Sequence, residues 1–426
     1  MREANRGGPG LVGRAVRALH RLVHPDHADE RARLDAYARK VDKHAAAQRE
    51  HLAALRAEMD RLAGGLSHHA TRNDLRAIDQ TLERIREASD RHYRLTAQAV
   101  RSADWQEELR VVERRLKNRL AGLARSRGPI VVGPWTGEVG FELLYWIPFV
   151  TRAVERARID GERLVIVSRG GAQPWYAHLG GRYLDVLSFV PPDAFRAATE
   201  AQKKQWRVGP FDRSIVRRVM AAVGERRVQL VHPGLMYPLF RPVWKGRETS
   251  RRIEEHATHR LINVGALPDM QRRLPSRYIA VRFYFSTCFP DTPGNRALVG
   301  SIVRRLAQNH DVVLLNTGIE VDDHRDFLPD AHDRIHSVDD LMRPERNLDV
   351  QTAVVAKADA FVGTYGGYSY LAPLCGVPSI AFYSDLTFQH AHLEVAQRVF
   401  RRIGAGALTP LDVRSVDLLS QALPSR

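Results

Sequence analysis

The stretch that decides the fold is ADAFVGTYGGYSYLAPLCGVPSIAFY, residues 358–383. Its apolar run at 360–362 predicts a short strand, and the glycines that follow predict a tight loop. A helix is expected over 368–375 and a second strand over 379–383. Because a strand, a helix and a strand at this spacing form a parallel unit with a right-handed crossover, the stretch predicts an open parallel α/β sheet.

The same alternation extends over most of the chain. Strands are predicted at 130–132, 164–168, 186–190 and 228–232, and again at 278–282, 311–315 and 335–337. Helices are predicted at 295–308, at 348–357 and at 141–157, where Pro148 is expected to bend or break the helix. We therefore expect two α/β domains that face a cleft, with the boundaries 129–240 and 277–400, a connection over 241–276 and a helical tail over 401–426.

Residues 26–128 differ from the rest because they contain no proline and are rich in helix formers. Apolar residues recur there at alternating steps of three and four, as at Leu52, Leu55, Met59, Leu62 and Leu66. This spacing is typical of a coiled coil that joins copies of the chain or docks a partner. It also fits a helical hairpin or bundle packed on the body, and both interpretations stay open.

The first 25 residues hold a short basic amphipathic segment. Apolar residues between 11 and 23 are interspersed with Arg14, Arg17 and Arg21. Such a segment can lie on an anionic membrane, and it can equally be a solvated helix end.

Composition excludes several classes of protein. The chain has 426 residues, 44% hydrophobic and 27% charged, as in an ordinary globular protein. Its two cysteines, Cys288 and Cys375, allow neither a disulfide framework nor a cysteine-based zinc site. No secretory signal is recognised, and no apolar run reaches the roughly 20 residues of a membrane span. We expect a soluble cytoplasmic protein, with a peripheral contact at the inner face of the membrane if the first segment binds lipid.

The net charge of +16 indicates an anionic partner. Residues 1–128 hold 27 Lys and Arg against 18 Asp and Glu, and residues 129–426 hold 38 against 31. The excess is therefore spread over both parts of the chain. No helix-turn-helix, zinc-finger or aromatic-basic RNA motif accompanies it, so we expect no nucleic acid as a partner.

The glycine-rich loop is the first candidate binding site, because ligands of open parallel sheets bind beyond the carboxyl ends of the strands. Gly363, Gly366 and Gly367 would let a ligand approach the backbone, and the next helix offers free N–H groups. Thr364 and Ser369 would add hydroxyl donors, so the loop suits a diphosphate. A plain strand–helix turn also favours glycine, and this alternative stays open.

With Gly376, Val377 and Pro378 before the next strand, this segment resembles the donor half of GT-B glycosyltransferases, especially heptosyltransferase-like and fucosyltransferase-like members. The stretch GPWTGEVGFELLYWIPF, residues 133–149, resembles the first loop and helix of the acceptor domain in bacterial polysaccharide-type transferases. The resemblance covers residues 129–400 and implies two Rossmann-like domains facing a cleft. It implies that the second domain binds a nucleotide-sugar as co-substrate, without a separate cofactor, and that the first binds the acceptor.

The resemblance also implies roles for single residues. Arg282 follows the first strand of the second domain and would clamp a diphosphate, with a structural ion pair as its alternative role. Ser286 and Thr287 lie in the same loop and are further donor-binding candidates. His336 belongs to the third strand–helix connection, where bases or riboses often bind.

Sugar transfer with inversion needs a base that takes the proton of the acceptor hydroxyl. Glu138 in the first loop and Glu142 at the start of the next helix are the candidates. Either carboxylate would alternatively favour the helix N-terminus by electrostatics alone.

No essential metal is expected. Asp322-Asp323 and Asp339-Asp340 are better explained as helix starts than as the metal-binding acidic motifs of the other main transferase fold. His390, His392 and Glu394 are not a convincing metal site, because positions i and i+2 point apart on a helix. They are expected to be solvated, and a contact of one of them with the sugar is the alternative.

These observations predict a metal-independent glycosyltransferase. It would move a sugar from a GDP- or UDP-sugar to a hydroxyl of a glycan or lipid-linked glycan in surface polysaccharide assembly. Two alternatives stay open: a nucleotide-sugar epimerase on the same fold, and a non-catalytic coiled-coil scaffold with a body that binds a sugar nucleotide.

Overall fold

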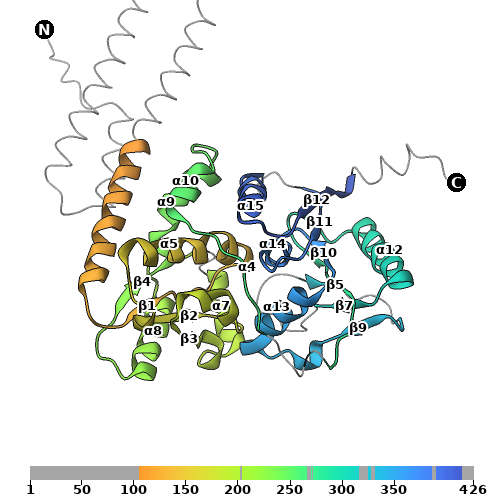
Figure 1. Ribbon diagram of the computed structural model, residues 1–426, viewed down its shortest axis with the longest axis horizontal. Coiled ribbons are helices and arrows are strands. Elements are labelled where there is room, and N and C mark those ends of the chain that lie inside the picture. The colour runs from red at the N-terminus through yellow and green to blue at the C-terminus, as the bar shows by residue number, and fades with distance from the viewer. Residues whose placement is uncertain are drawn as a thin grey trace, which may run out of the picture. The chain divides into compact units, whose positions relative to one another are not determined.

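The computed structural model describes residues 105–201, 204–265, 270, 272–315, 325–327, 332–385 and 390–414. The chain divides into two compact units, 1–100 and 101–426, and all the described residues belong to the second. The basic segment 1–25, the heptad-like run at 52–66 and the pair Asp322-Asp323 therefore lie outside the described residues. The second unit is an α/β structure with two separate parallel sheets (Figure 1).

The first sheet has four parallel strands in the order β3-β2-β1-β4. They are β1 Ile130–Val132, β2 Leu164–Ser168, β3 Arg182–Asp185 and β4 Gln229–Val231. Strand β1 contributes Ile130 and Val132 to one apolar core and Val131 to another, as the twofold period of a strand requires. The second core lies between the sheet and α7 Pro192–Ala201 and α8 Pro210–Val223.

The third strand of this sheet lies earlier than predicted. The strand expected over 186–190 is wrong, because β3 ends at Asp185 and Val186–Ser188 form the 3-10 turn η4. Asp185 stabilises the turn, since its Oδ1 accepts from the backbone N of Leu187 at 2.9 Å. The apolar residues Val186 and Leu187 are buried in the second core rather than paired in the sheet.

The helix after β1 is continuous but changes its winding. It comprises α4 Val139–Phe141, the π-helical turn η1 Glu142–Trp146 and α5 Ile147–Ala157. The predicted helix is confirmed and begins two residues earlier. Pro148 does not break it, because it follows the π-helical turn and the carbonyl oxygen of Leu144, four residues back, lies 2.9 Å from His259 Nε2 instead. All of η1 is buried.

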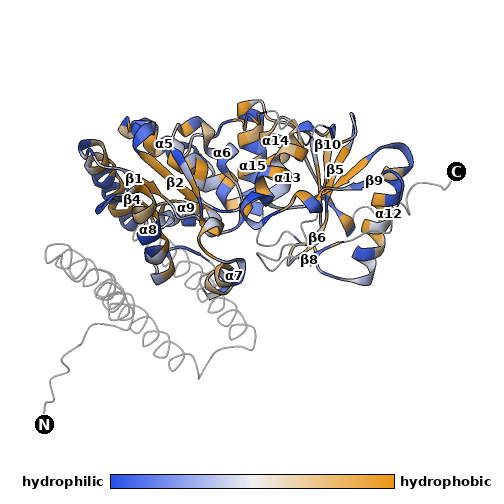
Figure 2. Ribbon diagram, turned by 90° about the horizontal axis from the view of Figure 1, so that it is seen from below, coloured by the Kyte–Doolittle hydropathy of each residue, from blue (hydrophilic) through white to orange (hydrophobic). Residues whose placement is uncertain are grey.

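The second sheet has six parallel strands in the order β12-β11-β10-β5-β7-β9. They are β5 Ile279–Arg282, β7 Val312–Leu314, β9 Ile335–Ser337, β10 Ala360–Thr364, β11 Ser379–Tyr383 and β12 Leu408–Asp412. The helices between them are α12 Pro293–Asn309, α13 Asn347–Lys357, α14 Gly367–Leu374 and α15 His390–Ile403. Figure 2 shows apolar strands in the interior of both sheets.

The predicted helical tail is wrong in part. Helix α15 ends at Ile403, and residues 408–412 form the edge strand β12, which pairs in parallel with β11. Leu408 and Leu411 pack against the main apolar core, which explains why this short segment adds to the sheet. Pro410 is tolerated because the strand is at the edge.

The helix at 105–125 packs on the first domain. Leu116, Leu120 and Leu123 are buried in the main core. Glu113 accepts from Arg252 of α10 Arg251–His256 at 2.5 Å. This last part of the N-terminal region therefore packs on the first domain, while the hairpin, bundle and coiled-coil interpretations concern residues outside the described ones.

Helix α15 lies in sequence between β11 and β12 of the second sheet, but it also packs beside the first domain. It contacts α9 Tyr237–Trp244. Its Glu394 accepts from Ser250 at 3.0 Å, and its Arg402 forms an ion pair with Glu254 at 3.1 Å. The two domains are therefore joined by this contact as well as by the segment 241–276, which is the expected connection.

The second sheet has the strand order of a doubly wound nucleotide-binding fold, in which a crevice opens where the order reverses. That reversal lies between β5 and β10. Gly363 pairs there with Arg282, and a Cβ on Gly363 would lie 2.0 Å from the carbonyl oxygen of Arg282.

We expect Gly363→Ala to lower the free energy of unfolding by about 1–3 kcal/mol, because the methyl group must push β10 away from β5. The matched control is Gly294→Ala in the first turn of α12, where no atom lies within 4 Å of the added Cβ. Chemical denaturation measures both variants. Equal stability of the two would contradict the close approach of β10 to β5.

Candidate active site

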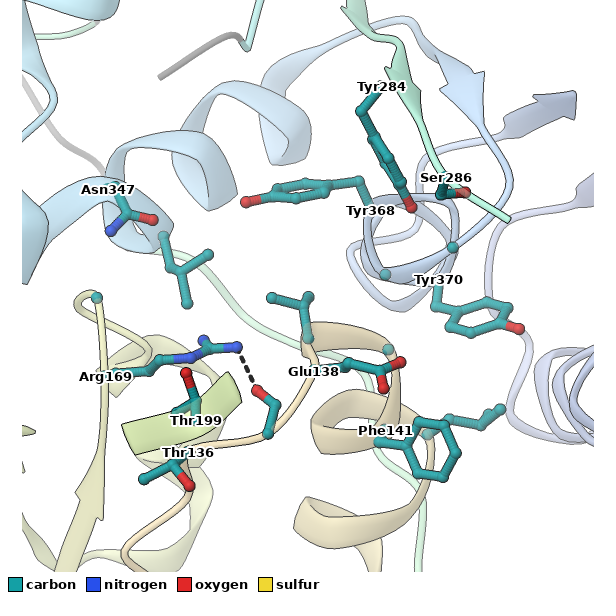
Figure 3. Close-up of a pocket in the computed structure, with 18 of the residues that line it drawn as sticks. Thr136, Glu138, Phe141, Arg169, Thr199, Tyr284, Ser286, Asn347, Tyr368 and Tyr370 are labelled. Carbon is teal, nitrogen blue, oxygen red and sulfur yellow. Dashed lines mark hydrogen bonds between the residues drawn. The ribbon is translucent and has the colours of Figure 1, made fainter. Parts of the chain in front are cut away.

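A pocket of about 710 Å³ lies where the carboxyl ends of the two sheets meet. The loop after β1 and the residues after β2 line one wall. The end of β5, the loop that follows it and the turn after β10 line the other wall (Figure 3). The pocket therefore occupies the place at which parallel sheets bind ligands, and both domains contribute to it.

The structure brings some of the predicted site residues to this pocket and leaves others outside it. The residues that line it are Glu138, Arg282, Ser286, Thr287, Gly366 and Gly367. The residues that do not are Glu142, His336, Gly363, Thr364 and Ser369.

Arg282 is a buried cation at the end of β5. It is 7% exposed, and its guanidinium lies over the ring of Tyr368 at 4.4 Å. Its Nη1 donates to Gln351 Oε1 at 2.6 Å, and its Nη2 forms an ion pair with Asp326 at 3.3 Å. The side chain is thus held rigidly in a structural ion pair while it also lines the pocket.

The hydroxyls of Thr364 and Ser369 build the turn instead of facing the pocket. Thr364 Oγ1 donates to the carbonyl of Tyr284 at 2.8 Å and accepts from its N–H at 3.0 Å. Ser369 Oγ accepts from the N–H of Gly366 at 3.0 Å, which caps α14. Both side chains are fully buried, so the turn offers the pocket its backbone at Gly366 and Gly367 rather than these hydroxyls.

The turn at Gly366 and Gly367 requires residues without a side chain. Gly366 has a φ of +154°, and a Cβ there would meet the hydroxyl of Tyr284. A Cβ on Gly367 would lie 2.7 Å from Val139 and 3.0 Å from the backbone N of Gly140. The start of α14 in the second domain therefore lies in direct contact with α4 in the first.

His336 lies far along the second sheet. It belongs to β9, the edge strand, which β7 separates from β5. Its Nε2 lies 2.9 Å from Asp311 Oδ1, so the imidazole pairs with the residue that precedes β7. The sequence places His336 in the third strand, but the pocket forms at the reversal between β5 and β10.

Glu138 is an exposed carboxylate on the pocket wall. Its side chain is 60% exposed, and its Oε1 forms an ion pair with Lys204 at 2.8 Å. The Lys204 ammonium also lies 3.7 Å from the centre of the Phe141 ring. Glu138 can therefore meet a ligand while its negative charge is balanced.

Glu142, in contrast, is fully buried behind the pocket wall. Its Oε1 accepts from Ser168 at 2.5 Å and from Tyr176 at 2.7 Å. Burial raises the pKa of Glu142 to about 7, although the guanidinium of Arg169, 3.7 Å away, opposes the shift. This carboxyl group lies behind the loop that follows β1 and does not line the pocket.

Several pocket residues were missed or misjudged from the sequence, among them Arg169 and His392. Arg169 directly follows β2, and this position at the carboxyl end of a strand was the signal that could have found it. His392, expected to be solvated, is 9% exposed, and its Nδ1 lies 2.6 Å from the Tyr145 hydroxyl. Burial lowers the pKa of His392 to about 4, so the ring is neutral near pH 7.

The described residues contain no cluster of three or more His, Cys, Asp or Glu that could hold a metal ion. Asp340 of the pair Asp339-Asp340 forms an ion pair with Arg273 at 2.6 Å. Within the same described ranges, no helix combines the length and the apolar character needed to cross a membrane.

Comparisons with known proteins show a likeness in structure only. No protein-family model matches the sequence, and no curated protein matches it. Among solved structures, 49 chains match. TibC, an iron-containing dodecameric glycosyltransferase from enterotoxigenic E. coli H10407, is 14% identical over 60% of this chain, with a TM-score of 0.33. The match spans 59% of the TibC chain.

Two further matches are E. coli heptosyltransferases. WaaC, solved with ADP, is 16% identical over 69% of this chain and 99% of its own, with a TM-score of 0.33. The ADP-heptose LPS heptosyltransferase II is 13% identical over 62% of this chain and 87% of its own, with a TM-score of 0.35. At such identities and TM-scores the matches carry no argument of their own, and the function proposed below rests on the geometry of this chain.

Proposed function

We propose that this protein is a glycosyltransferase that moves a sugar from a nucleoside-diphosphate sugar to an acceptor hydroxyl. The observation that carries the proposal is the shared pocket, with a buried cation on the wall of one sheet and an exposed carboxylate on the other. Two reactants that approach from opposite domains would meet there. Its volume of about 710 Å³ lies within the usual range of ligand pockets.

The second domain is proposed to bind the donor. Arg282 lies at the crevice where the strand order reverses, which is where doubly wound sheets bind nucleotides. Its fixed guanidinium would stabilise the charge that develops on the diphosphate as the sugar leaves. Ser286 and Thr287 in the next loop also line the pocket and would add polar contacts. This arrangement supports a reaction that needs no essential metal.

Glu138 is proposed as the base. The acceptor hydroxyl would lose its proton to this carboxylate as its oxygen attacks the anomeric carbon and the nucleoside diphosphate departs. Glu142 was the other candidate, but it is fully buried and its oxygens face Ser168 and Tyr176. A supporting role for Glu142 fits this placement better than proton transfer from a substrate.

The acceptor and the location complete the proposal. A glycan or lipid-linked glycan of surface polysaccharide assembly, reached at the inner face of a membrane, agrees with the excess of basic residues. Self-association or a partner bound through the N-terminal region belongs to the same proposal. Nucleotide-sugar epimerisation is the alternative reaction, and it would consume the donor without an acceptor.

A nucleotide-sugar should raise the melting temperature of the full chain, since a ligand that binds only the folded state stabilises it. A panel of ADP-, GDP- and UDP-sugars tests this. Arg282→Lys and Arg282→Gln should weaken the effect by about tenfold or more in affinity, because neither keeps the bidentate fork. The control is Arg305→Gln on the exposed face of α12. No shift with any member of the panel would overturn the proposal.

Glu138→Gln should lower the turnover of sugar transfer by about 100- to 10,000-fold while donor binding persists, because only the proton acceptor is lost. Release of the nucleoside diphosphate in the presence of acceptor glycans measures turnover. Glu162→Gln, an exposed change in the first domain, is the matched control. Full activity of Glu138→Gln would assign the base elsewhere without affecting the donor site.

Glu142 should make stability depend on pH. In the folded chain the Glu142 carboxyl group keeps its proton up to about pH 7, whereas in the unfolded chain it loses the proton near its ordinary pKa of 4.5. The contribution of Glu142 to the free energy of unfolding is therefore largest below about pH 4.5, and it decreases as the pH rises to about 7. Asp185, whose pKa burial also raises, adds a decline of the same sign.

Glu142→Gln removes the contribution of Glu142 alone, so its stability relative to the wild type should improve as pH rises between about 5 and 8. Urea unfolding at several pH values measures the trend. The exposed change Glu225→Gln should show no such trend. Parallel curves for Glu142→Gln and the wild type would contradict a raised pKa.

A further inference from the structure

We propose that the pocket contains a second anion-binding subsite, centred on Arg169, that takes a carboxylate or phosphate group of the acceptor. The identification of the ligand as the acceptor rests on the proposed function. The anion site itself rests on the placement and charge of Arg169 and stands apart from the donor site at Arg282.

Arg169 is built into the wall of the first domain. It directly follows β2, is 9% exposed, and lines the pocket. Its Nη2 donates to the carbonyl of Gly137 at 2.5 Å, which fixes the guanidinium. Figure 3 shows it beside Thr136 and Thr199, while Tyr284 and Tyr368 lie across the pocket. An anion at Arg169 would therefore contact the opposite wall from a diphosphate at Arg282.

The positive charge of Arg169 is only partly balanced by the protein. Its acidic neighbour Glu142 is 3.7 Å away, beyond hydrogen-bond length, and the pKa of that carboxyl is raised to about 7. Near neutral pH the neighbour is protonated in a large share of molecules. A buried guanidinium is costly without an anion, so an anionic group in the pocket would stabilise it.

The pocket places a buried arginine on each of its two walls. Arg169 lies on one wall and Arg282, which is paired with Asp326, lies on the other. Glu138 pairs with Lys204, and burial keeps the pocket residue His392 neutral near pH 7. The two buried arginines, Arg169 and Arg282, come from different sheets. Two separate anionic groups explain their placement better than one anionic group does.

Anion binding at Arg169 should depend on the protonation of Glu142. The groups that face Glu142 are Arg169, Tyr176, Tyr183 and Asp185. The pKa values of both tyrosines are raised well above the ordinary value, so they stay neutral. When Glu142 gains its proton, Arg169 loses its neighbouring negative charge and attracts an anion more strongly. Asp185, whose pKa is also raised, would likewise strengthen anion binding as the pH falls and it gains a proton.

Sulfate is the suitable probe, because it keeps a charge of −2 at both pH values while phosphate would titrate. The melting temperature of the full chain is measured in about 50 mM sodium sulfate and in about 150 mM sodium chloride, which have equal ionic strength. The measurement is made at about pH 6 and about pH 8, on either side of the pKa of Glu142. A sulfate titration at each pH gives the apparent affinity.

We expect the wild type to bind sulfate about three- to tenfold more tightly at the lower pH. Arg169→Gln should abolish this pH-dependent response, and Arg169→Lys should weaken it, with each variant referred to its own melting temperature in chloride. Glu142→Gln should bind sulfate with little pH dependence. Arg282→Gln should keep the pH-dependent part, and the exposed change Arg207→Gln should match the wild type.

The proposal is overturned if Arg169→Gln keeps the pH-dependent sulfate response, or if the wild type shows none. Loss of the response in Arg282→Gln but not in Arg169→Gln would place the anion at the donor site and overturn it equally. Failure of every nucleotide-sugar to bind, with the sulfate response intact, would remove the proposed transferase and leave the anion site. Donor binding without a sulfate response would remove the anion site and leave the proposed transferase.

Discussion

The pairing of β5 with β10 is the constraint on which the pocket depends. These strands come from opposite halves of the second sheet, and the chain order reverses between them. Because Gly363 has no side chain, β10 can lie close beside Arg282 at the end of β5. The guanidinium is then held between Gln351 and Asp326 and under Tyr368, so its direction is set before any ligand arrives. Preorganised charge of this kind is what stabilises a leaving group most effectively.

The first domain meets this arrangement through close backbone contact. Gly367 at the start of α14 touches Val139 and Gly140 of α4, and the buried Tyr145 bonds His392 of α15. Trp175 also donates to Thr352 across the two domains at 2.9 Å. These contacts hold the Glu138 loop near the pocket wall that carries Arg282, and the buried group of Glu142 and Arg169 supports that loop from the other side.

Sequence patterns predicted the positions of the helices and strands better than they predicted the contacts between them. The strands at 130–132, 164–168, 335–337 and 379–383 were placed correctly, because buried parallel strands are short apolar runs between turn residues. The strand expected over 186–190 failed because an apolar run can be buried in a turn as well as in a strand. The final strand, β12, was missed because its strand conformation depends on pairing with β11, which its own sequence pattern does not show.

The candidate site shows the same limit. Arg282 and Glu138 were found because each lies at the carboxyl end of a strand or in the loop after it. The burial of Glu142 depends on Ser168 and Tyr176, which are 26 and 34 residues away, and the burial of His392 depends on Tyr145, 247 residues away. Spacing along the chain does not contain such partnerships, so burial and its effect on pKa became visible only in the folded structure.

The return of α15 to the first domain has a consequence for synthesis on the ribosome. The surface formed by α9 and α10 emerges first, and Ser250 meets Glu394 only after 144 further residues have been made. The ion pair of Glu254 with Arg402 forms at the same late stage. Domains usually fold in order as they emerge. Here part of the face of the first domain stays uncovered until α15 has been made, although the strands and helices of that domain emerge earlier.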